Sequence, residues 1–302
     1  MKSKTGEVRA IILVALSAAT CGGKSVTPSA SATPPSVPAA MPPGSPPNSG
    51  KGSPLQSLHW RGKSKNLEVR AVNGPVRAVL GSGDEADIVA NVLKSKHGTP
   101  LRLQVIEKNG LTLACVVSAN EEERDDDDDD HGHSRGDHHA HREHGDQPAN
   151  DGDECGRKLH GTAVELLVQV PRGTKFAGWT VNGAVEAQGL EGEVEAHTQN
   201  GSIHIETSGV ARASTVNGPI RAKIGAKTWN GTLALESVNG RLEVELPSDV
   251  GAELRADTVH GSVRVTPRMD GARIEDNHVE GRLGKGGGEL RLRTVNGPIE
   301  VR

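Results

Sequence analysis

Short runs of alternating hydrophobic and polar residues fill the C-terminal half of the chain. A period of two with one charged side is typical of a β-strand that buries a single face. No long helical pattern is evident, so the pattern predicts an all-β protein. The inward positions are Ile203/Ile205, Ile220/Ala222/Ile224, Leu242/Val244/Leu246, Val263/Val265 and Ile299/Val301, and the outward ones include His204, Arg221, Lys223, Glu243, Glu245, Arg264 and Glu300.

Each run follows a phrase of the type Thr-Val-Asn-Gly. Neighbouring phrases are 16 to 22 residues apart, and TVNGPI occurs twice, from Thr215 and from Thr294. Units this small cannot bury a hydrophobic face alone, so they are expected to stack as in a solenoid. The glycines of the phrases are Gly183, Gly201, Gly218, Gly240, Gly261, Gly281 and Gly297, and an eighth copy surrounds Gly74.

Proline decides how the chain turns at these phrases. Asn-Gly between alternating strands normally predicts a two-residue hairpin. Pro75, Pro219 and Pro298 follow the glycine and lack the N–H that closes such a hairpin. We therefore expect a corner between two sheets, with glycine supplying an unusual backbone angle and stacked asparagines hydrogen-bonding between units. The expected corner residues are Asn73, Gly74, Asn182, Gly183, Asn217, Gly218, Asn239, Gly240, Asn296 and Gly297.

The favoured fold is thus a β-solenoid, similar to a parallel β-helix, in which units stack in sequence order. An antiparallel β-meander or sandwich is the alternative. Residues 58–302 would form this repeat domain, with 58–119 as opening strands and N-terminal cap. The chain has 38 glycines and few aromatics, so the core must be aliphatic. Phe176, Trp179 and Trp229 are expected in the core or cap.

The N-terminus has the features of an export signal. Lys2, Lys4 and Arg9 precede an apolar run too short to span a bilayer, which indicates a signal peptide over residues 1–20. Cys21 follows small residues and is the expected lipid-attachment site, although cleavage after Ala19 would leave a soluble exported protein. Residues 21–57 are rich in Pro, Ser and Ala and are expected to be a disordered tether.

An acidic, histidine-rich insert interrupts the domain at residues 121–154. It holds 15 acidic residues against three arginines, a formal charge of −12, and is expected to be disordered. Its histidines and carboxylates are ligand types for Zn²⁺, Ni²⁺ or Cu²⁺, but no fixed spacing defines a site, so no cofactor is expected beyond adventitious divalent metal. The candidate ligands are His131, His133, His138, His139, His141 and His144.

Two cysteines flank this insert. In an oxidising compartment Cys115 and Cys155 are expected to pair and to close a loop of about 40 residues. Two free thiols are the alternative.

The repeats resemble the bacterial putative-adhesin domain family of exported β-strand-repeat proteins, a domain of unknown function. The resemblance rests on LEVRAVNGPV from Leu67, the segment from Val164 to Gly192, the TVNG phrases and SVNGRLEVELP ending at Pro247. It covers roughly residues 58–302 and implies a right-handed β-solenoid-like fold, surface or periplasmic placement and no catalytic residues. It does not account for the insert.

Three functions are compatible with these features. The first is a non-enzymatic lipoprotein, anchored to a bacterial membrane on the periplasmic side or at the cell surface, whose repeat domain binds an envelope protein or polymer. The second is metal binding through the insert. The third is a polysaccharide-acting enzyme that uses Glu243, Glu245 and Glu253 with Arg264 and Arg268, although aromatic platforms for sugar rings are few.

Two further expectations concern partners. The last strand, Ile299 to Arg302, would form an open sheet edge able to accept a partner strand, unless Pro298, Glu300 and Arg302 protect it. Nucleic acid is not expected as a partner, because positive charges alternate with glutamates.

Overall fold

The computed structural model describes residues 55–95, 100–119, 155, 159, 161–275 and 277–302. These residues form two long β-sheets and no helix. Consequently, no helix that could cross a membrane occurs in the described part of the chain. The expected signal peptide, the tether up to residue 54 and the acidic insert lie outside the described residues.

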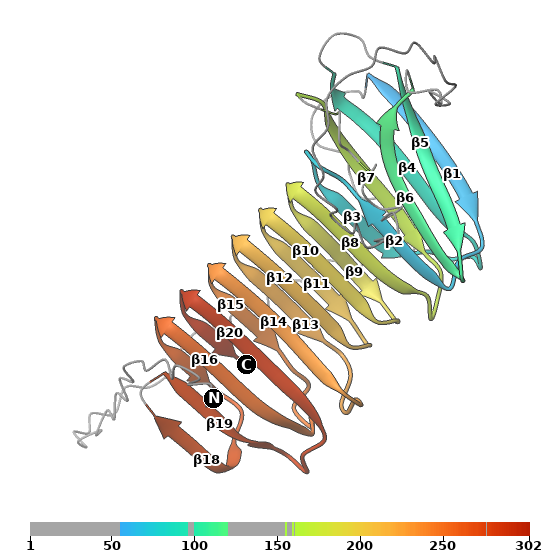
Figure 1. The fold of residues 1–302 in the computed structure, drawn as a ribbon. Coiled ribbons are helices and arrows are strands. Elements are labelled where there is room, and N and C mark those ends of the chain that lie inside the picture. The colour runs from blue at the N-terminus through green and yellow to red at the C-terminus, as the bar shows by residue number, and fades with distance from the viewer. Residues whose placement is uncertain (1–54, 96–99, 120–154, 156–158, 160, 276) are drawn as a thin grey trace, which may run out of the picture.

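The two sheets face each other along a rod (Figure 1). The first sheet has the order β1 (Gln56–Gly62), β4 (Ala86–Lys94), β7 (Ala163–Val170), β3 (Val76–Leu80), β9 (Val185–Leu190), β11 (Ile203–Thr207), β13 (Ile220–Ile224), β15 (Leu242–Glu245), β21 (Ile299–Val301) and β17 (Val263–Val265). The second has the order β18 (Met269–Glu275), β19 (His278–Leu283), β16 (Ala252–His260), β20 (Gly288–Asn296), β14 (Thr232–Asn239), β12 (Ala211–Asn217), β10 (Val194–Asn200), β8 (Lys175–Asn182), β2 (Asn66–Arg70), β6 (Leu111–Ser118) and β5 (Leu101–Lys108).

The repeating unit is a rung, which we define as one strand of the second sheet, a corner, and one strand of the first sheet. Seven rungs stack in the order β2–β3, β8–β9, β10–β11, β12–β13, β14–β15, β20–β21 and β16–β17. Strands of neighbouring rungs are parallel in both sheets, for example β10 with β12 and β11 with β13. The chain therefore winds onward at each corner, which confirms the solenoid and excludes the antiparallel meander.

The core is a narrow aliphatic layer between the sheets. Ile203, Ile205, Leu242 and Val244 are at most 1% exposed, and other rungs place equivalent residues beside them. The alternation in the sequence is thus the alternation between core and solvent. Phe176 and Trp229 also belong to this core, as expected.

The order of the rungs differs from the order of the sequence. The C-terminal rung, β20–β21, lies between β14–β15 and β16–β17. The expectation of an open edge at Ile299 to Arg302 is therefore wrong, because β21 is paired on both sides and the first sheet ends at β17 instead. Figure 1 shows the C-terminus inside the stack.

One phrase of the repeat does not form a corner. The phrase around Gly281 lies within β19, which runs antiparallel to β16 and forms a hairpin with β18 at the end of the second sheet. In this phrase both the Thr and the Asn positions are replaced, by His278 and Glu280, whereas the corners with Ala71 or His260 depart from the motif at only one of these positions. The seventh rung is supplied by the upstream copy around Gly74, whose asparagine bridges to Asn182.

At the other end, β1, β4 and β7 extend the first sheet, and β5 and β6 extend the second. β4 is antiparallel to both β1 and β7, and β5 is antiparallel to β6. Residues 58–119 thus supply both the first rung and part of a cap, while β7 comes from beyond the insert.

Candidate functional site

A ladder of asparagine side chains runs along the corner edge of the solenoid. In each step the Nδ2 of one asparagine donates to the Oδ1 of the asparagine on a neighbouring rung. The five bonds are Asn182 to Asn73 (2.9 Å), Asn200 to Asn182 (2.9 Å), Asn217 to Asn200 (2.9 Å), Asn239 to Asn217 (2.9 Å) and Asn296 to Asn239 (2.7 Å). His260 occupies the same register position on the last rung. Each amide thus satisfies its neighbour while the edge stays exposed.

The threonine of each phrase secures the same corner from inside. Thr215 Oγ1 donates to the carbonyl oxygen of Gly201 (3.2 Å), and Thr294 Oγ1 donates to that of Gly240 (3.0 Å). Both threonines are nearly buried, so this bond satisfies a hydroxyl that has lost water. Equivalent bonds from Thr180, Thr198, Ser237 and Thr258 repeat the arrangement along the stack.

Glycine is required at the corners because neighbouring rungs approach closely. A Cβ on Gly201 would lie 1.9 Å from the carbonyl oxygen of Gly183, and one on Gly240 would lie 1.8 Å from that of Gly218. The expected role of an unusual backbone angle applies only before proline, where Gly74 has a φ of 128°. At the other corners contact between rungs is the reason.

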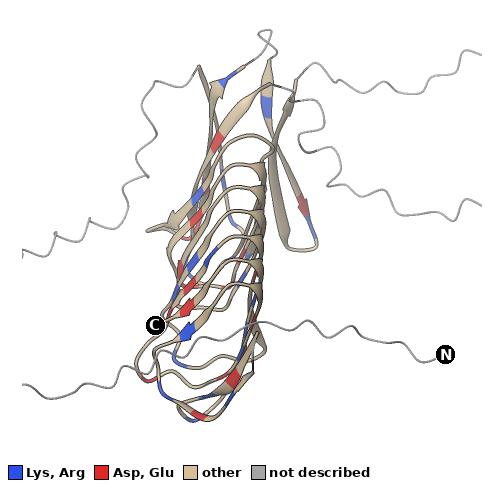
Figure 2. Ribbon diagram, turned by 90° about the vertical axis from the view of Figure 1, so that its left-hand side faces the viewer, with Lys and Arg blue, Asp and Glu red and all other residues tan. Residues whose placement is uncertain are grey.

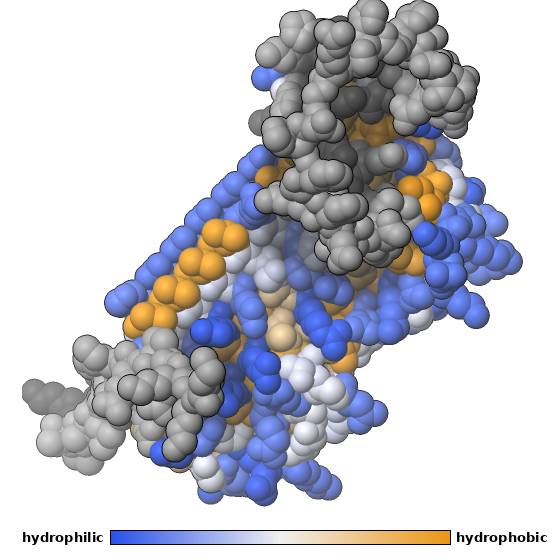
Figure 3. Space-filling view, viewed as in Figure 1, coloured by the Kyte–Doolittle hydropathy of each residue, from blue (hydrophilic) through white to orange (hydrophobic). Residues whose placement is uncertain are grey.

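The middle residue of each phrase forms a hydrophobic line beside the ladder. Val216 and Val238 are 42% and 40% exposed, and Val259 and Val295 are partly exposed in the same register. Figure 3 shows this line of hydrophobic residues next to a hydrophilic edge. Gln199 replaces valine on one rung. We call these valines and the asparagine ladder together the corner ridge.

A second row of functional groups crosses the outer face of the second sheet. Arg70, Trp179, His197 and Ser214 are register partners on successive rungs. The rings of Trp179 and His197 stack with centroids 3.8 Å apart, and the Arg70 guanidinium lies 5.8 Å from the Trp179 ring. Both faces of the indole are therefore covered, so it offers no platform for a sugar ring. Trp179 was expected in the core or cap, and this expectation is wrong.

His197 connects a hydroxyl and a carboxylate in the same row. Its Nδ1 lies 2.6 Å from Ser214 Oγ and its Nε2 lies 2.8 Å from Glu195 Oε1. Acyl transfer also needs backbone donors for an oxyanion. The strand of Ser214, β12, is paired with β10 and β14, so the ladders use the backbone donors around it. The group is better explained as a polar row that holds three rungs in register.

The outer face of the first sheet is covered by ion pairs. Arg221 and Arg302 contact Glu243 at 2.8 and 2.9 Å, and Lys223 contacts Glu206 at 2.9 Å. The hydrogen bond from Arg221 lowers the pKa of Glu243, although the burial of this carboxylate acts in the opposite direction. Figure 2 shows acidic and basic positions mixed along the stacked strands. Such a face is matched internally rather than carrying one net sign.

The carboxylates suggested for a polysaccharide-acting site are not brought together. Glu243 and Glu245 lie on β15 in the first sheet, whereas Glu253 lies on β16 in the second sheet and pairs with Arg282 at 3.2 Å. Arg264 is separated from Glu243 by the rung of Glu300. The structure thus contradicts the proximity that this hypothesis assumed.

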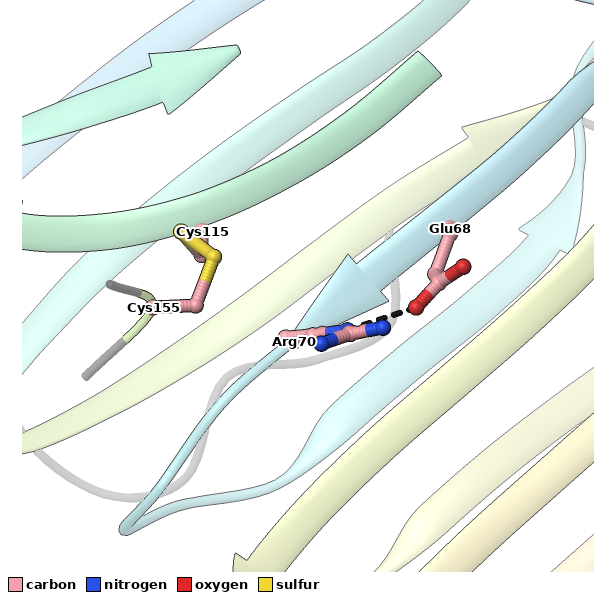
Figure 4. Close-up of a disulfide and its surroundings, with 4 residues drawn as sticks. All are labelled: Glu68, Arg70, Cys115 and Cys155. Atoms are coloured by element: carbon pink, nitrogen blue, oxygen red, sulfur yellow. Dashed lines mark hydrogen bonds and ion pairs between the residues drawn. A yellow bond between two sulfur atoms is a disulfide. The ribbon is translucent and has the colours of Figure 1, made fainter. Parts of the chain in front are cut away.

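The two cysteines beside the insert form a disulfide. Cys115 and Cys155 are joined with an S–S distance of 2.08 Å (Figure 4). Cys115 is the register partner of Arg70, which also contacts Glu68 at 2.6 Å. The disulfide therefore lies at the end of the Trp179 row.

The other predicted site residues are not placed. Cys21 and the six histidines of the insert lie outside the described residues. Within the part of the chain that is described, no group of three or more His, Cys, Asp or Glu side chains is arranged to hold a metal ion. Metal binding and lipidation therefore stay predictions.

Comparison with known proteins identifies the repeat. The model of the family described as Toastrack DUF4097 matches residues 172–302, which contain six of the seven rungs. The match confirms the resemblance drawn from the TVNG phrases. No curated protein matches the chain.

Two solved structures are similar in part. One is a putative cell adhesion protein from Clostridium sporogenes ATCC 15579, with 12% identity, a TM-score of 0.42, and coverage of 82% of this chain and 98% of that one. The other is a putative adhesin from Bacteroides fragilis NCTC 9343, with 9% identity, a TM-score of 0.26 and the same coverages. Neither TM-score is high enough to support an argument about this chain.

Proposed function

We propose that the protein is a non-enzymatic cell-envelope lipoprotein whose solenoid is an adhesin-like binding surface or scaffold, on the basis of the match of residues 172–302 to the Toastrack DUF4097 model. The observation that carries this proposal is the corner ridge. It presents exposed valines and a continuous amide ladder along several rungs. A straight, repeated surface of this kind suits a long protein or polymer partner better than a small substrate.

The outer faces support a binding role over a catalytic one. Arg221 and Lys223 of the first sheet are engaged in ion pairs, and the backbone donors around Ser214 are used by the strand ladders. Envelope placement rests on the export signal, on Cys21 and on the Pro-rich tether. The lipid would hold the solenoid at a membrane, and the tether would separate it from that surface.

Anchoring is tested with the Cys21→Ser variant. The wild-type protein should incorporate labelled palmitate and remain with the membrane fraction, whereas the variant should incorporate none and be released by washing. A wild-type protein that takes up no label, or a variant that stays membrane-bound, would refute the anchor.

Binding is tested on a chain that carries Cys21→Ser in every case, so that it is handled in solution. Val216→Lys and Val238→Lys together place two charges on the corner ridge. Leu93→Lys is the matched control, since Leu93 is 43% exposed and lies on β4, outside the seven rungs. The bound amount is measured on isolated envelopes of the source cells.

The corner-ridge variant should lose most of its binding, because a lysine that replaces an interfacial valine must desolvate a charge. The Leu93 variant should bind as the parent chain does. Equal binding by all three chains would contradict the assignment to the corner ridge, and no binding by the parent chain would contradict the envelope partner.

A further inference from the structure

The C-terminal rung has an unusual place in the stack. The chain completes β14–β15, then forms β16–β17 and the β18–β19 hairpin, and finally returns with β20–β21 to fill the position between them. In the described sheets, β16 and β17 reach the remaining rungs only through β20 and β21. β20 and β21 therefore hold β16 to β19 onto the stack.

The position filled by this rung is a slot with two complementary walls. Leu290, Leu292, Ile299 and Val301 are fully buried between the sheets. On one wall, Asn296 continues the asparagine ladder; on the other, Thr258 donates to the carbonyl oxygen of Gly297 at 3.0 Å. The slot is thus shaped for a segment with the Thr-Val-Asn-Gly motif.

Polar contacts at its outer faces make the slot selective for this particular segment. Thr232 Oγ1 donates to Glu289 at 2.9 Å on the second sheet. Arg302 pairs with Glu243 at 2.9 Å on the first sheet. The neighbouring rung β16–β17 has Glu253 at the register position of Glu289 but Thr266 at that of Arg302, so it would lose the contact to Glu243.

The connection that precedes the segment is suited to act as a hinge. Residues 284–287 have the sequence Gly-Lys-Gly-Gly and join β19 to β20. Gly284 and Gly286 have φ values of 53° and 75°, and three glycines in four residues allow many other conformations. The segment can therefore be redirected without disturbing β19.

From these observations we propose that the C-terminal rung is a donor segment that is exchanged between copies of this chain. In the exchanged state β20–β21 of one copy fills the slot of a second copy, and the reverse exchange closes a dimer. The segment makes the same contacts in its own copy and in a second copy. The free energies of the monomer and the exchanged dimer therefore differ mainly through the hinge conformation and the entropy of association. Exchange is thus a route by which solenoids held at a common surface become joined, and it does not depend on what the corner ridge binds.

The test uses two full-length copies that differ in size through a tag on one of them. Both carry Cys21→Ser, and Cys115 and Cys155 are paired in the disulfide, so each engineered cysteine is the only free thiol of its copy. One copy carries Glu236→Cys and the other Arg293→Cys, since these residues are register partners on β14 and β20. The copies are mixed at high concentration, warmed gently below unfolding and oxidised. Heterodimers are then counted by non-reducing gel electrophoresis.

The matched control pairs a Ser214→Cys copy with a Glu236→Cys copy. These positions are register partners on β12 and β14, neither of which belongs to the C-terminal rung. Exchange predicts at least about tenfold more heterodimer from the first mixture, because chance encounters do not hold two thiols at disulfide distance. Heterodimer at or below the control level would overturn the proposal.

Discussion

The contact between stacked corners predicts that a single methyl group at Gly240 will destabilise the domain. An added Cβ would lie 1.8 Å from the carbonyl oxygen of Gly218 and 2.8 Å from Ser237 Oγ. Gly240 is not among the glycines with positive φ, so an alanine there suffers from this contact rather than from its backbone angle. The two rungs must therefore separate locally by more than an ångström.

Four of the hydrogen bonds between these two rungs lie at the corner. The N–H of Gly218 donates to the carbonyl oxygen of Asn239 at 3.0 Å, and the N–H of Ile220 donates to that of Arg241 at 2.9 Å. Ser237 Oγ donates to Gly218 at 3.1 Å, and Asn239 donates to the ladder at 2.9 Å. At about 1 kcal/mol net each, weakening all four costs about 4 kcal/mol of unfolding free energy.

The measurement is denaturant unfolding followed by circular dichroism and tryptophan fluorescence. Gly83→Ala is the control, because its added Cβ would have its nearest neighbour at 3.9 Å, an ordinary contact. This control should change the unfolding free energy by less than about 0.5 kcal/mol. If Gly240→Ala were as mild as Gly83→Ala, the close stacking of corners would be wrong.

Three further predictions follow from other contacts. Replacing Cys115 and Cys155 by serine should cost about 4 kcal/mol, because the disulfide closes a 40-residue loop in the unfolded chain; thermal unfolding with and without reductant measures this. Partial burial lowers the pKa of His278, but hydrogen bonds to Asp257 and Glu280 outweigh it and raise this pKa. The charged imidazole should therefore stabilise the β18–β19 hairpin fully below about pH 6.5 and lose this effect as pH rises through the raised value, as an NMR titration would follow. Deleting β20 and β21 should abolish amide protection in β16 and β17 while β8 to β13 keep theirs, as hydrogen exchange would measure.

Each of these has a clear contrary result. Equal stability of the wild-type and serine forms under oxidising conditions would contradict the role of the disulfide. A His278 that titrates at or below its ordinary value would contradict the two carboxylate contacts. Continued protection of β16 and β17 after the deletion would mean that the shortened chain stacks them directly on β14 and β15.

The winding of the chain could be predicted from sequence because its causes are local. Pro219 and Pro298 remove the N–H that a hairpin requires, and the period of two defines the buried face. The asparagine ladder followed from stacking identical corners. The structural roles that could be predicted from sequence are therefore those of residues that recur at the same position in each rung.

The order of the rungs could not be predicted, because the corners at Gly240, Gly261 and Gly297 carry nearly the same motif. Any of them can stack on any other, and contacts far apart in sequence decide between them. The predicted backbone angle of glycine is confirmed at Gly74, Gly218 and Gly297. The close contact between corners could not be predicted, because the carbonyl oxygen that excludes a side chain belongs to another rung.

Two local signals in the sequence were nevertheless overlooked. The residue before each Thr of the motif always faces outward in the second sheet, which would have placed Trp179, His197 and Ser214 in one row. The phrase around Gly281 is the one in which both the Thr and the Asn positions of the motif are replaced, by His278 and Glu280. That difference marks it as a strand rather than a corner.

The central claim is that the C-terminal rung lies inside a parallel stack, and spin labels on the second sheet test it most directly. Arg293 is the register partner of both Glu236 and Asp257. Labels at 236 and 293 should therefore couple strongly at about one strand spacing of 4.8 Å, and labels at 236 and 257 only weakly at about two spacings. Strong coupling between 236 and 257 together with weak coupling between 236 and 293 would show that the rungs stack in sequence order, which would contradict this account.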